Sequence, residues 1–298
     1  MDLAFIGSKE LGFECLKSLI DKGFHIPFVI TLNDSKDTRS CFEEFKLISK
    51  ENGIKFIVDA DEESLKDNIK LHSIKTILVC NWYKIISKSV IEILENGIYG
   101  IHNSLLPKYR GMSPLIWSAL SDDDYIGSSL FKFDQGMDTG DIAKQWKLKN
   151  EGLYIKEIID KLSELIVKDL PMTMNNILNN EIKHSKQNNA EATYCNKRNP
   201  EDSKLCWNKL TSKEAMKHIR ILNEPYPYNF SILDHKKVVI LKARPFNSPI
   251  YGIPGSLFQL EGETIVCCLD GKGIILEEVA DEFGKNIALT SLKGRFNN

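Results

Sequence analysis

Two short stretches of this 298-residue sequence carry residue types that acid–base chemistry needs. In 97–111, a short apolar strand is expected to deliver His102 to its C-terminal end. Thirty-six residues further on, Asp138 lies in a Gly-rich acidic loop, 133–141, which follows an expected strand. A carboxylate beside an imidazole can orient it and raise its pKa, as general acid–base catalysis requires. Taken singly, such a His is more often structural and such a loop more often solvated, but together they predict a catalytic site.

The first half of the chain contains the elements that must position these two residues. Short apolar runs typical of strands alternate with helical patterns, and a long amphipathic helix follows over 153–168. This alternation predicts an open, mainly parallel sheet with helices on both faces, an α/β fold. Ligands of such sheets bind outside the carboxyl ends of the strands. The expected strands are 3–6, 27–32, 55–58 and 76–80, the expected helices are 11–20, 41–52 and 90–94, and the polar stretch 180–191 is expected to be a surface excursion or linker.

Beyond about residue 205 the pattern changes to short β-runs separated by turns. Thr211 and Glu214 have the spacing of a capping box that opens a helix running to about Leu222. The later runs predict a small antiparallel barrel or sandwich. We therefore expect a catalytic domain over 1–204 and a β-rich C-terminal domain over 205–298; the expected β-runs are 228–233, 237–243, 256–260, 264–269 and 273–279.

Composition and charge exclude several classes of protein. The 39 Lys and Arg nearly balance the 41 Asp and Glu, which argues against a protein that holds nucleic acid mainly by its charge. No run of 18 or more apolar residues occurs, so a membrane span is not expected. The seven Cys are an odd number, scattered and without Cys-x-x-Cys spacing, so neither a disulfide framework nor a zinc site is expected. The cytoplasm is the compartment that this cysteine usage favours.

A third stretch, 7–12, joins the first expected strand to the first expected helix, where phosphates often bind. It lacks the Lys and Ser/Thr of a P-loop and the glycine spacing of a dinucleotide fingerprint. A tight turn is the favoured interpretation, although a helix N-terminus at this edge can still contact a ligand.

The two catalytic stretches together resemble a known family. His102-x-Ser-Leu-Leu-Pro-x-x-Arg-Gly111, followed by Gly136-Met-Asp-Thr-Gly-Asp141, is similar to the formyltransferases that use 10-formyltetrahydrofolate. The resemblance covers the first two hundred residues well and the rest more loosely. It implies a Rossmann-like catalytic sheet and an OB-like C-terminal domain. Arg198-x-Pro-x-Asp202 and Trp207 look most like the enzymes that act on nucleotide-linked amino sugars.

The resemblance also implies a mechanism without a metal. An amine attacks the formyl carbon on N10 of the folate, His102 takes or relays the proton, and Asp138 orients His102 and tunes its pKa. The family has an oxyanion-binding Asn two residues before the His, where this chain has Gly100. Asn103 is a candidate replacement if the chain turns there; in an extended strand it would point to the opposite face.

Further site residues are carried over by position. The expected folate-binding residues lie in the loop after the strand 76–80 and in the Asp138 loop: Trp82, Lys84, Ile85, Ile86, Asp134, Gln135, Gly136 and Met137. The expected substrate-binding residues are Lys9, Tyr109, Arg110, Gly111, Met112 and Arg198. For the isoleucines simple core packing competes with this role, and for the three cations a surface salt bridge does.

Three functions remain open. The favoured one is formylation of a nucleotide-linked amino sugar in surface polysaccharide synthesis, with homodimerisation expected by analogy. The second is methionyl-tRNA formyltransferase, which must hold a polyanion; residues 201–298 carry 13 Lys or Arg and 12 Asp or Glu, which lowers that possibility. The third is a catalytically weak relative, suggested by Gly100 but opposed by the retention of His102 and Asp138.

Overall fold

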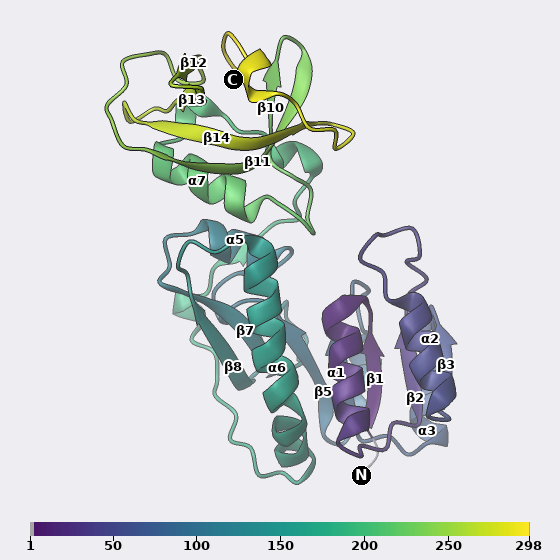
Figure 1. Ribbon diagram of the computed structural model, residues 1–298. Helices are drawn as coiled ribbons and strands as arrows, with labels where there is room; N and C mark the ends of the chain where they lie inside the picture. The colour runs from purple at the N-terminus through teal and green to yellow at the C-terminus, as the bar shows by residue number, and fades with distance from the viewer. Residues whose placement is uncertain (1–2, 298) are drawn as a thin grey trace. The chain divides into compact units, whose positions relative to one another are not determined.

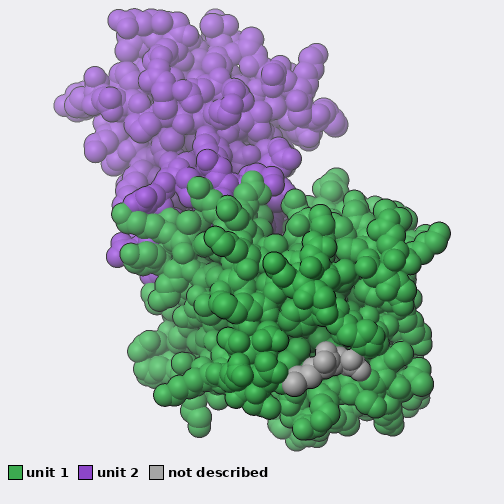
Figure 2. Space-filling model, turned by 60° about the horizontal axis from the view of Figure 1, so that its bottom comes forward, with its two compact units in different colours: residues 1–118, 125–149, 159–196 green, residues 119–124, 150–158, 197–298 purple. Residues whose placement is uncertain are grey.

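The computed structural model describes residues 3–297 and divides into two compact units, coloured separately in Figure 2. Unit 1 comprises residues 1–118, 125–149 and 159–196, and unit 2 comprises 119–124, 150–158 and 197–298. Each unit has a sheet and a hydrophobic core of its own.

Unit 1 is built on a seven-stranded sheet with the order β3-β2-β1-β4-β5-β7-β8. The first five strands run parallel, while β7 is antiparallel to both β5 and β8. The predicted mainly parallel α/β sheet is therefore confirmed. The strands are β1 (Leu3–Gly7), β2 (Phe28–Thr31), β3 (Lys55–Val58), β4 (Thr76–Cys80), β5 (Gly97–His102), β7 (Tyr125–Lys132) and β8 (Ile142–Lys149).

Helices cover both faces of this sheet because its central strands bury alternate side chains on opposite sides. Leu3 and Phe5 of β1 pack in one core, beneath α1, α2 and α6, whereas Ala4 and Ile6 pack in another, against α3 and α4. Figure 1 shows α1 and α6 on the same side of the sheet. The helices are α1 (Lys9–Asp21), α2 (Phe42–Glu51), α3 (Glu62–Leu71), α4 (Lys88–Glu92), α5 (Pro114–Leu120) and α6 (Ile155–Leu178). Within residues 3–297, none of the helices combines the length and apolarity needed to cross a membrane.

Helix α6 extends ten residues beyond the predicted end at 168 and contains Pro171. A proline inside a helix removes one backbone hydrogen bond and crowds the preceding turn. Leu170, Met174 and Ile177 are nevertheless buried in the core against the sheet. Packing of this apolar face outweighs the local cost of the proline.

The segment after α6 is not a linker. The backbone of Ser185 exchanges two hydrogen bonds with Ile142 at the start of β8, both 2.8 Å long. Further along, β9 (Tyr194–Cys195) pairs in parallel with β6 (Arg110–Gly111). These contacts attach the predicted surface excursion to the loops that follow β5 and β7.

Unit 2 contains a five-stranded antiparallel sheet with the order β10-β11-β14-β13-β12. Its last residues partly close the sheet, because Asn297 bridges Ile232 in β10 and Arg295 bridges Ser256 beside β12, so the predicted barrel-like domain is confirmed as a half-barrel. The capping box of Thr211 and Glu214 opens α7 as predicted. The elements are α7 (Ser212–Ile221), β10 (Phe230–Leu233), β11 (Lys236–Phe246), β12 (Leu257–Leu260), β13 (Glu263–Cys267) and β14 (Gly273–Asp281); short 3-10 helices lie at Asn189–Glu191, Pro200–Ser203, Trp207–Lys209 and Leu289–Ser291.

Candidate active site

His102 ends β5 at the carboxyl edge of the sheet, with 10% of its side chain exposed. Its Nε2 lies 2.8 Å from the backbone oxygen of Tyr109. A carbonyl oxygen can only accept a hydrogen bond, so Nε2 must carry the proton. In the neutral ring Nδ1 is then the nitrogen with a free lone pair, so it is the ring atom that can accept a proton.

Asp138 faces this second nitrogen. Its Oδ2 lies 3.7 Å from His102 Nδ1, too far for a direct hydrogen bond but close enough for a carboxylate to stabilise an imidazolium. The same oxygen accepts a 2.8 Å hydrogen bond from the backbone N–H of Gly111. The structure therefore brings together the His and the Asp that the sequence singled out.

Gly100 lies two residues before His102 and on the same face of β5. A Cβ atom built on Gly100 would be 2.2 Å from Cε1 and 2.6 Å from Cζ of Phe133. The Phe133 ring packs 5.1 Å from that of Phe131, which meets His102 edge-on at 6.3 Å. An aromatic ring therefore fills the space that a side chain at position 100 would need.

Asn103 lies on the other face. In the β5–β7 pair His102 is opposite Ser129, and Ser128 points to the opposite side of the sheet from Ser129. The Oδ1 of Asn103 accepts a 3.1 Å hydrogen bond from Ser128 Oγ. This placement favours a structural role for Asn103 and not the replacement of an oxyanion-binding side chain.

Replacing Gly100 by asparagine is therefore expected to destabilise the protein and not to improve the site. Overpacking a filled core costs about 1–3 kcal/mol in the free energy of unfolding. Urea denaturation should show this loss for Gly100→Asn in the wild-type background and a smaller loss for the same substitution in a Phe133→Ala background. The control is Gly23→Asn, because a Cβ at Gly23 meets nothing within 4 Å and asparagine is among the residues that best tolerate its φ of +80°. A Gly100→Asn variant as stable as this control would contradict the assignment.

The loop that carries Asp138 is held by its own side chains. Asp134 Oδ1 accepts hydrogen bonds from the Gly136 N–H at 2.9 Å and from Thr139 Oγ1 at 2.6 Å. Thr139 lies so close that a Cβ on Gly136 would be 2.0 Å from its Oγ1. Gln135 and Met137 are exposed, the latter by 63%, so their side chains do not pack in the core.

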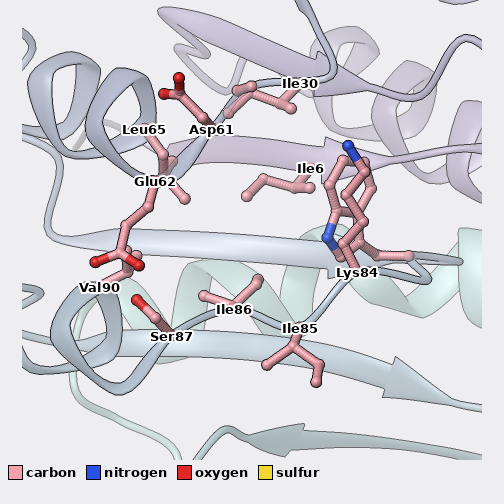
Figure 3. A pocket seen from close by; sticks show the side chains of 12 residues that line it. Ile6, Ile30, Asp61, Glu62, Leu65, Lys84, Ile85, Ile86, Ser87 and Val90 are labelled. Atoms are coloured by element: carbon pink, nitrogen blue, oxygen red, sulfur yellow. The ribbon is translucent and has the colours of Figure 1, made fainter.

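The loop after β4 contributes to a pocket at the carboxyl ends of β1, β2 and β4 (Figure 3). Ile6, Ile30 and Ile86 give it an apolar lining, and Trp82 and Lys84 also line it. The ammonium of Lys84 pairs with Asp59 at 2.9 Å, and this contact holds the pKa of Asp59 below its usual range. Ile85 is 97% exposed, so core packing does not account for it.

Lys9, an expected substrate cation, is buried at the start of α1. Its Nζ lies 2.5 Å from Asp34 Oδ2 and 2.8 Å from Asp37 Oδ2. Burial alone would lower the pKa of Lys9, but these two carboxylates outweigh it and leave the pKa raised. A hydrogen bond from Arg39 and another from Lys9 hold the pKa of Asp37 well below its usual range, although burial opposes them. Two carboxylates already neutralise Lys9, which favours a structural role.

Lys9→Met is accordingly expected to lower the free energy of unfolding by about 1–3 kcal/mol, because it leaves Asp34 without its cation and leaves Asp37 with Arg39 alone. Binding of an anionic substrate should be unchanged. Thermal unfolding and substrate titration measure the two effects, with exposed Lys50→Met on α2 as the control. Weakened substrate binding at unchanged stability would instead establish Lys9 as a substrate residue.

Arg110 is also buried, with 1% exposure. Its guanidinium donates to Gln187 Oε1 at 2.7 and 3.1 Å and to Asn189 Oδ1 at 2.9 Å. Tyr109 is held by a hydrogen bond from its N–H to Thr193 Oγ1, 2.8 Å long. The segment 187–195 therefore braces the loop after His102, and nothing in its polar sequence marked it as part of the site.

Three expected substrate residues remain: Gly111, Met112 and Arg198. Gly111, with φ 107°, approaches so closely that a Cβ would be 2.5 Å from the Cys195 oxygen, and Met112 is 48% exposed. Burial, followed by the charge of Asp138, raises the pKa of the Cys195 thiol to about 11. Arg198 belongs to unit 2, where its Nη2 donates a 2.9 Å hydrogen bond to the backbone oxygen of Asp202.

Comparisons with known proteins identify the family of this chain. The model of the family "Formyl transferase" matches residues 5–162, and that of "Formyl transferase, C-terminal domain" matches 197–296. The bifunctional polymyxin resistance protein ArnA of Wigglesworthia glossinidia brevipalpis is 31% identical over 263 residues, which cover 87% of this chain and 40% of that protein. The methionyl-tRNA formyltransferase of Lachnospira eligens is 30% identical over 252 residues, which cover 82% and 78%.

Two solved structures share the fold. WlaRD, described as a sugar 3N-formyl transferase in the presence of dTDP and 5-N-formyl-THF, has a TM-score of 0.70 at 22% identity, over 93% of this chain and 97% of that one. An N-formyltransferase from Helicobacter canadensis, in complex with folinic acid and dTDP-3-aminofucose, has a TM-score of 0.68 at 22% identity, over 92% and 98%.

Proposed function

The chain belongs to the formyl transferase family, and from this premise we propose that it moves a formyl group from 10-formyltetrahydrofolate to the amine of a nucleotide-linked amino sugar. Folate-dependent formyl transfer is the activity of the family; the sugar acceptor and the roles of individual residues are our proposal.

His102 and Asp138 would carry out the proton transfer of this reaction. The amine attacks the formyl carbon, the bond from that carbon to N10 breaks, and the amine loses a proton that N10 gains. With Nε2–H committed to the Tyr109 oxygen, His102 Nδ1 is the group that receives the proton and passes it on. Asp138, 3.7 Å from Nδ1, stabilises the imidazolium formed in between.

The residues present fit a folate at two places. The apolar lining of the pocket beside Trp82 and Ile86 suits a flat heteroaromatic ring, because burying such a ring needs apolar contact on its faces. The loop 134–137 lies in the chain immediately before Asp138, so a ligand bound there stays next to the proton acceptor. We propose that these two loops hold the folate.

The charge of residues 201–298 carries the proposal of a sugar acceptor. A tRNA is a polyanion, and proteins that bind one use clustered Lys and Arg to contact its phosphates. Residues 201–298 carry 13 basic and 12 acidic residues, and several are paired with each other, as Lys242 is with Glu278 at 2.6 Å. A nucleotide-linked sugar has only a diphosphate and does not require a basic domain.

The relatives support both acceptors. WlaRD was crystallised in the presence of dTDP, and the Helicobacter canadensis enzyme with dTDP-3-aminofucose, which supports the sugar. The Lachnospira eligens methionyl-tRNA formyltransferase is 30% identical and supports tRNA as the second candidate.

A panel assay tests the proposal. The purified protein is supplied with 10-formyltetrahydrofolate and amino sugars linked to dTDP, UDP or GDP, with the amine at C3 or C4. Mass spectrometry should detect the gain of one carbonyl on a single sugar, together with stoichiometric tetrahydrofolate. No formylated sugar anywhere in the panel, at enzyme concentrations that formylate methionyl-tRNA, would overturn the sugar proposal.

A further inference from the structure

The side chain of Gln187 forms hydrogen bonds both with the loop that carries Asp138 and with the buried guanidinium of Arg110. Its Nε2 donates to the backbone oxygens of Asp138 at 2.8 Å and of Gly140 at 2.7 Å. Its Oε1 accepts both hydrogen bonds that Arg110 sends to it. The two-bond pairing of Ser185 with Ile142 fixes the backbone two residues before Gln187.

Chemistry allows only one orientation of this amide. The two carbonyl oxygens can only accept, and a guanidinium can only donate, so the nitrogen must face Asp138 and Gly140 and the oxygen must face Arg110. Turning the amide over would set donors against donors and acceptors against acceptors. Arg110 thereby selects the orientation in which Gln187 binds the Asp138 loop.

The burial of Arg110 supports this interpretation. In residues 3–297 the guanidinium donates only to the neutral side chains of Gln187, Asn189 and Tyr194, and no carboxylate pairs with it. Burying a charge without a counter-ion is costly, so such a residue is retained where its directed donors are needed. Here the donors fix Gln187.

The backbone of Asp138 needs this support. Its φ is +53°, in the left-handed region, which non-glycine residues occupy only when their surroundings hold them there. The neighbouring Gly140 is tightly packed, because a Cβ there would lie 1.7 Å from the Lys132 oxygen. Gln187 contacts the backbone on both sides of Thr139, and the Gly111 N–H binds the Asp138 carboxylate.

We propose that Gln187 is a positioning residue for catalysis: oriented by Arg110, it fixes the Asp138 backbone so that the carboxylate faces His102. The inference rests on the proposed function, in which Asp138 stabilises the imidazolium. Gln187, in the polar segment that follows α6, thereby has a role in the reaction.

Gln187→Glu tests the proposal with a side chain of equal length. The carboxylate can still accept from Arg110, but it cannot donate to the two carbonyl oxygens. We expect kcat for formyl transfer to fall by about 10- to 100-fold, the range that a misplacement of about 1 Å produces, with KM unchanged. In an Asp138→Asn background the same substitution should cost nothing further, because the two residues act as one unit. Lys186→Gln, at the exposed neighbouring position, is the control.

Hydrogen exchange of the peptide 134–141 provides a readout that does not depend on the acceptor. Exchange should be faster in Gln187→Glu and unchanged in Lys186→Gln, at equal thermal stability. Unchanged exchange, or an equal loss of kcat in the wild-type and Asp138→Asn backgrounds, would overturn the positioning role. If the wild-type protein formylates no acceptor, the proposed function fails, and the exchange measurement still decides whether Gln187 holds the loop.

Discussion

Replacing His102 by glutamine is expected to lower kcat for formyl transfer by about 10²- to 10⁴-fold, the usual contribution of a positioned acid–base group. Glutamine has nearly the reach of histidine, and its amide can still donate to the Tyr109 oxygen, which now accepts from Nε2. It cannot take up the proton that Nδ1 would receive. The fold should survive, because glutamine occupies a similar space and keeps the hydrogen bond to the Tyr109 backbone oxygen.

Single-turnover rates with saturating donor measure this effect. His235→Gln, an exposed histidine in the turn between β10 and β11, controls for the substitution itself. A His102→Gln variant that keeps more than about a tenth of the wild-type rate would show that another group handles the proton, since acid–base loss is larger than that.

Asp138→Asn is expected to lower kcat by about 10²-fold, again without unfolding the site. The Asn oxygen can still accept the Gly111 N–H, so the contact that now measures 2.8 Å is retained. The negative charge 3.7 Å from His102 Nδ1 is lost, and with it the stabilisation of the imidazolium. KM should change little, because the substitution acts on the proton transfer.

Stopped-flow measurement of the chemical step separates this loss from product release. Asp67→Asn, at an exposed position on α3, is the matched control. Full activity of Asp138→Asn would mean that the carboxylate only supports the loop through Gly111.

Part of the site could be predicted from residue types and from the resemblance of two stretches to a known family. His102 and Asp138 could be paired in this way, but the path of the loop between them could not, because β7 is antiparallel to β5 and ends beside Tyr99, so the loop must return toward His102. Patterning also predicted the parallel sheet and the helices on both faces, since alternate residues of the central strands face two separate cores.

The remaining parts depend on contacts between residues far apart in the chain. Gln187 bonds Asp138 across 49 residues, and Thr193 bonds Tyr109 across 84. Polar residues in a polar stretch give no periodic signal, so this segment could only be predicted to lie at the surface. Likewise, a lysine or arginine has the same sequence signature whether it meets a diphosphate or a buried partner, which is why Lys9 and Arg110 were expected to bind substrate.

Gly100 illustrates the same limit. The sequence shows that a side chain is absent there, but the reason lies in Phe133, 33 residues away, whose ring occupies that space. A missing side chain and a filled space look identical until the packing is known.

A competition between methionyl-tRNA and the amino sugar is the most direct test of the proposed function. The protein is given 10-formyltetrahydrofolate with methionyl-tRNA and the preferred nucleotide-linked amino sugar in one solution, and the initial rates give the ratio of the two kcat/KM values. We expect the sugar to be formylated at least about 100-fold more efficiently, and His102→Gln to slow this transfer by about 10²- to 10⁴-fold. A ratio in favour of methionyl-tRNA would contradict the sugar acceptor and would show that a nearly neutral C-terminal unit can serve a polyanionic substrate.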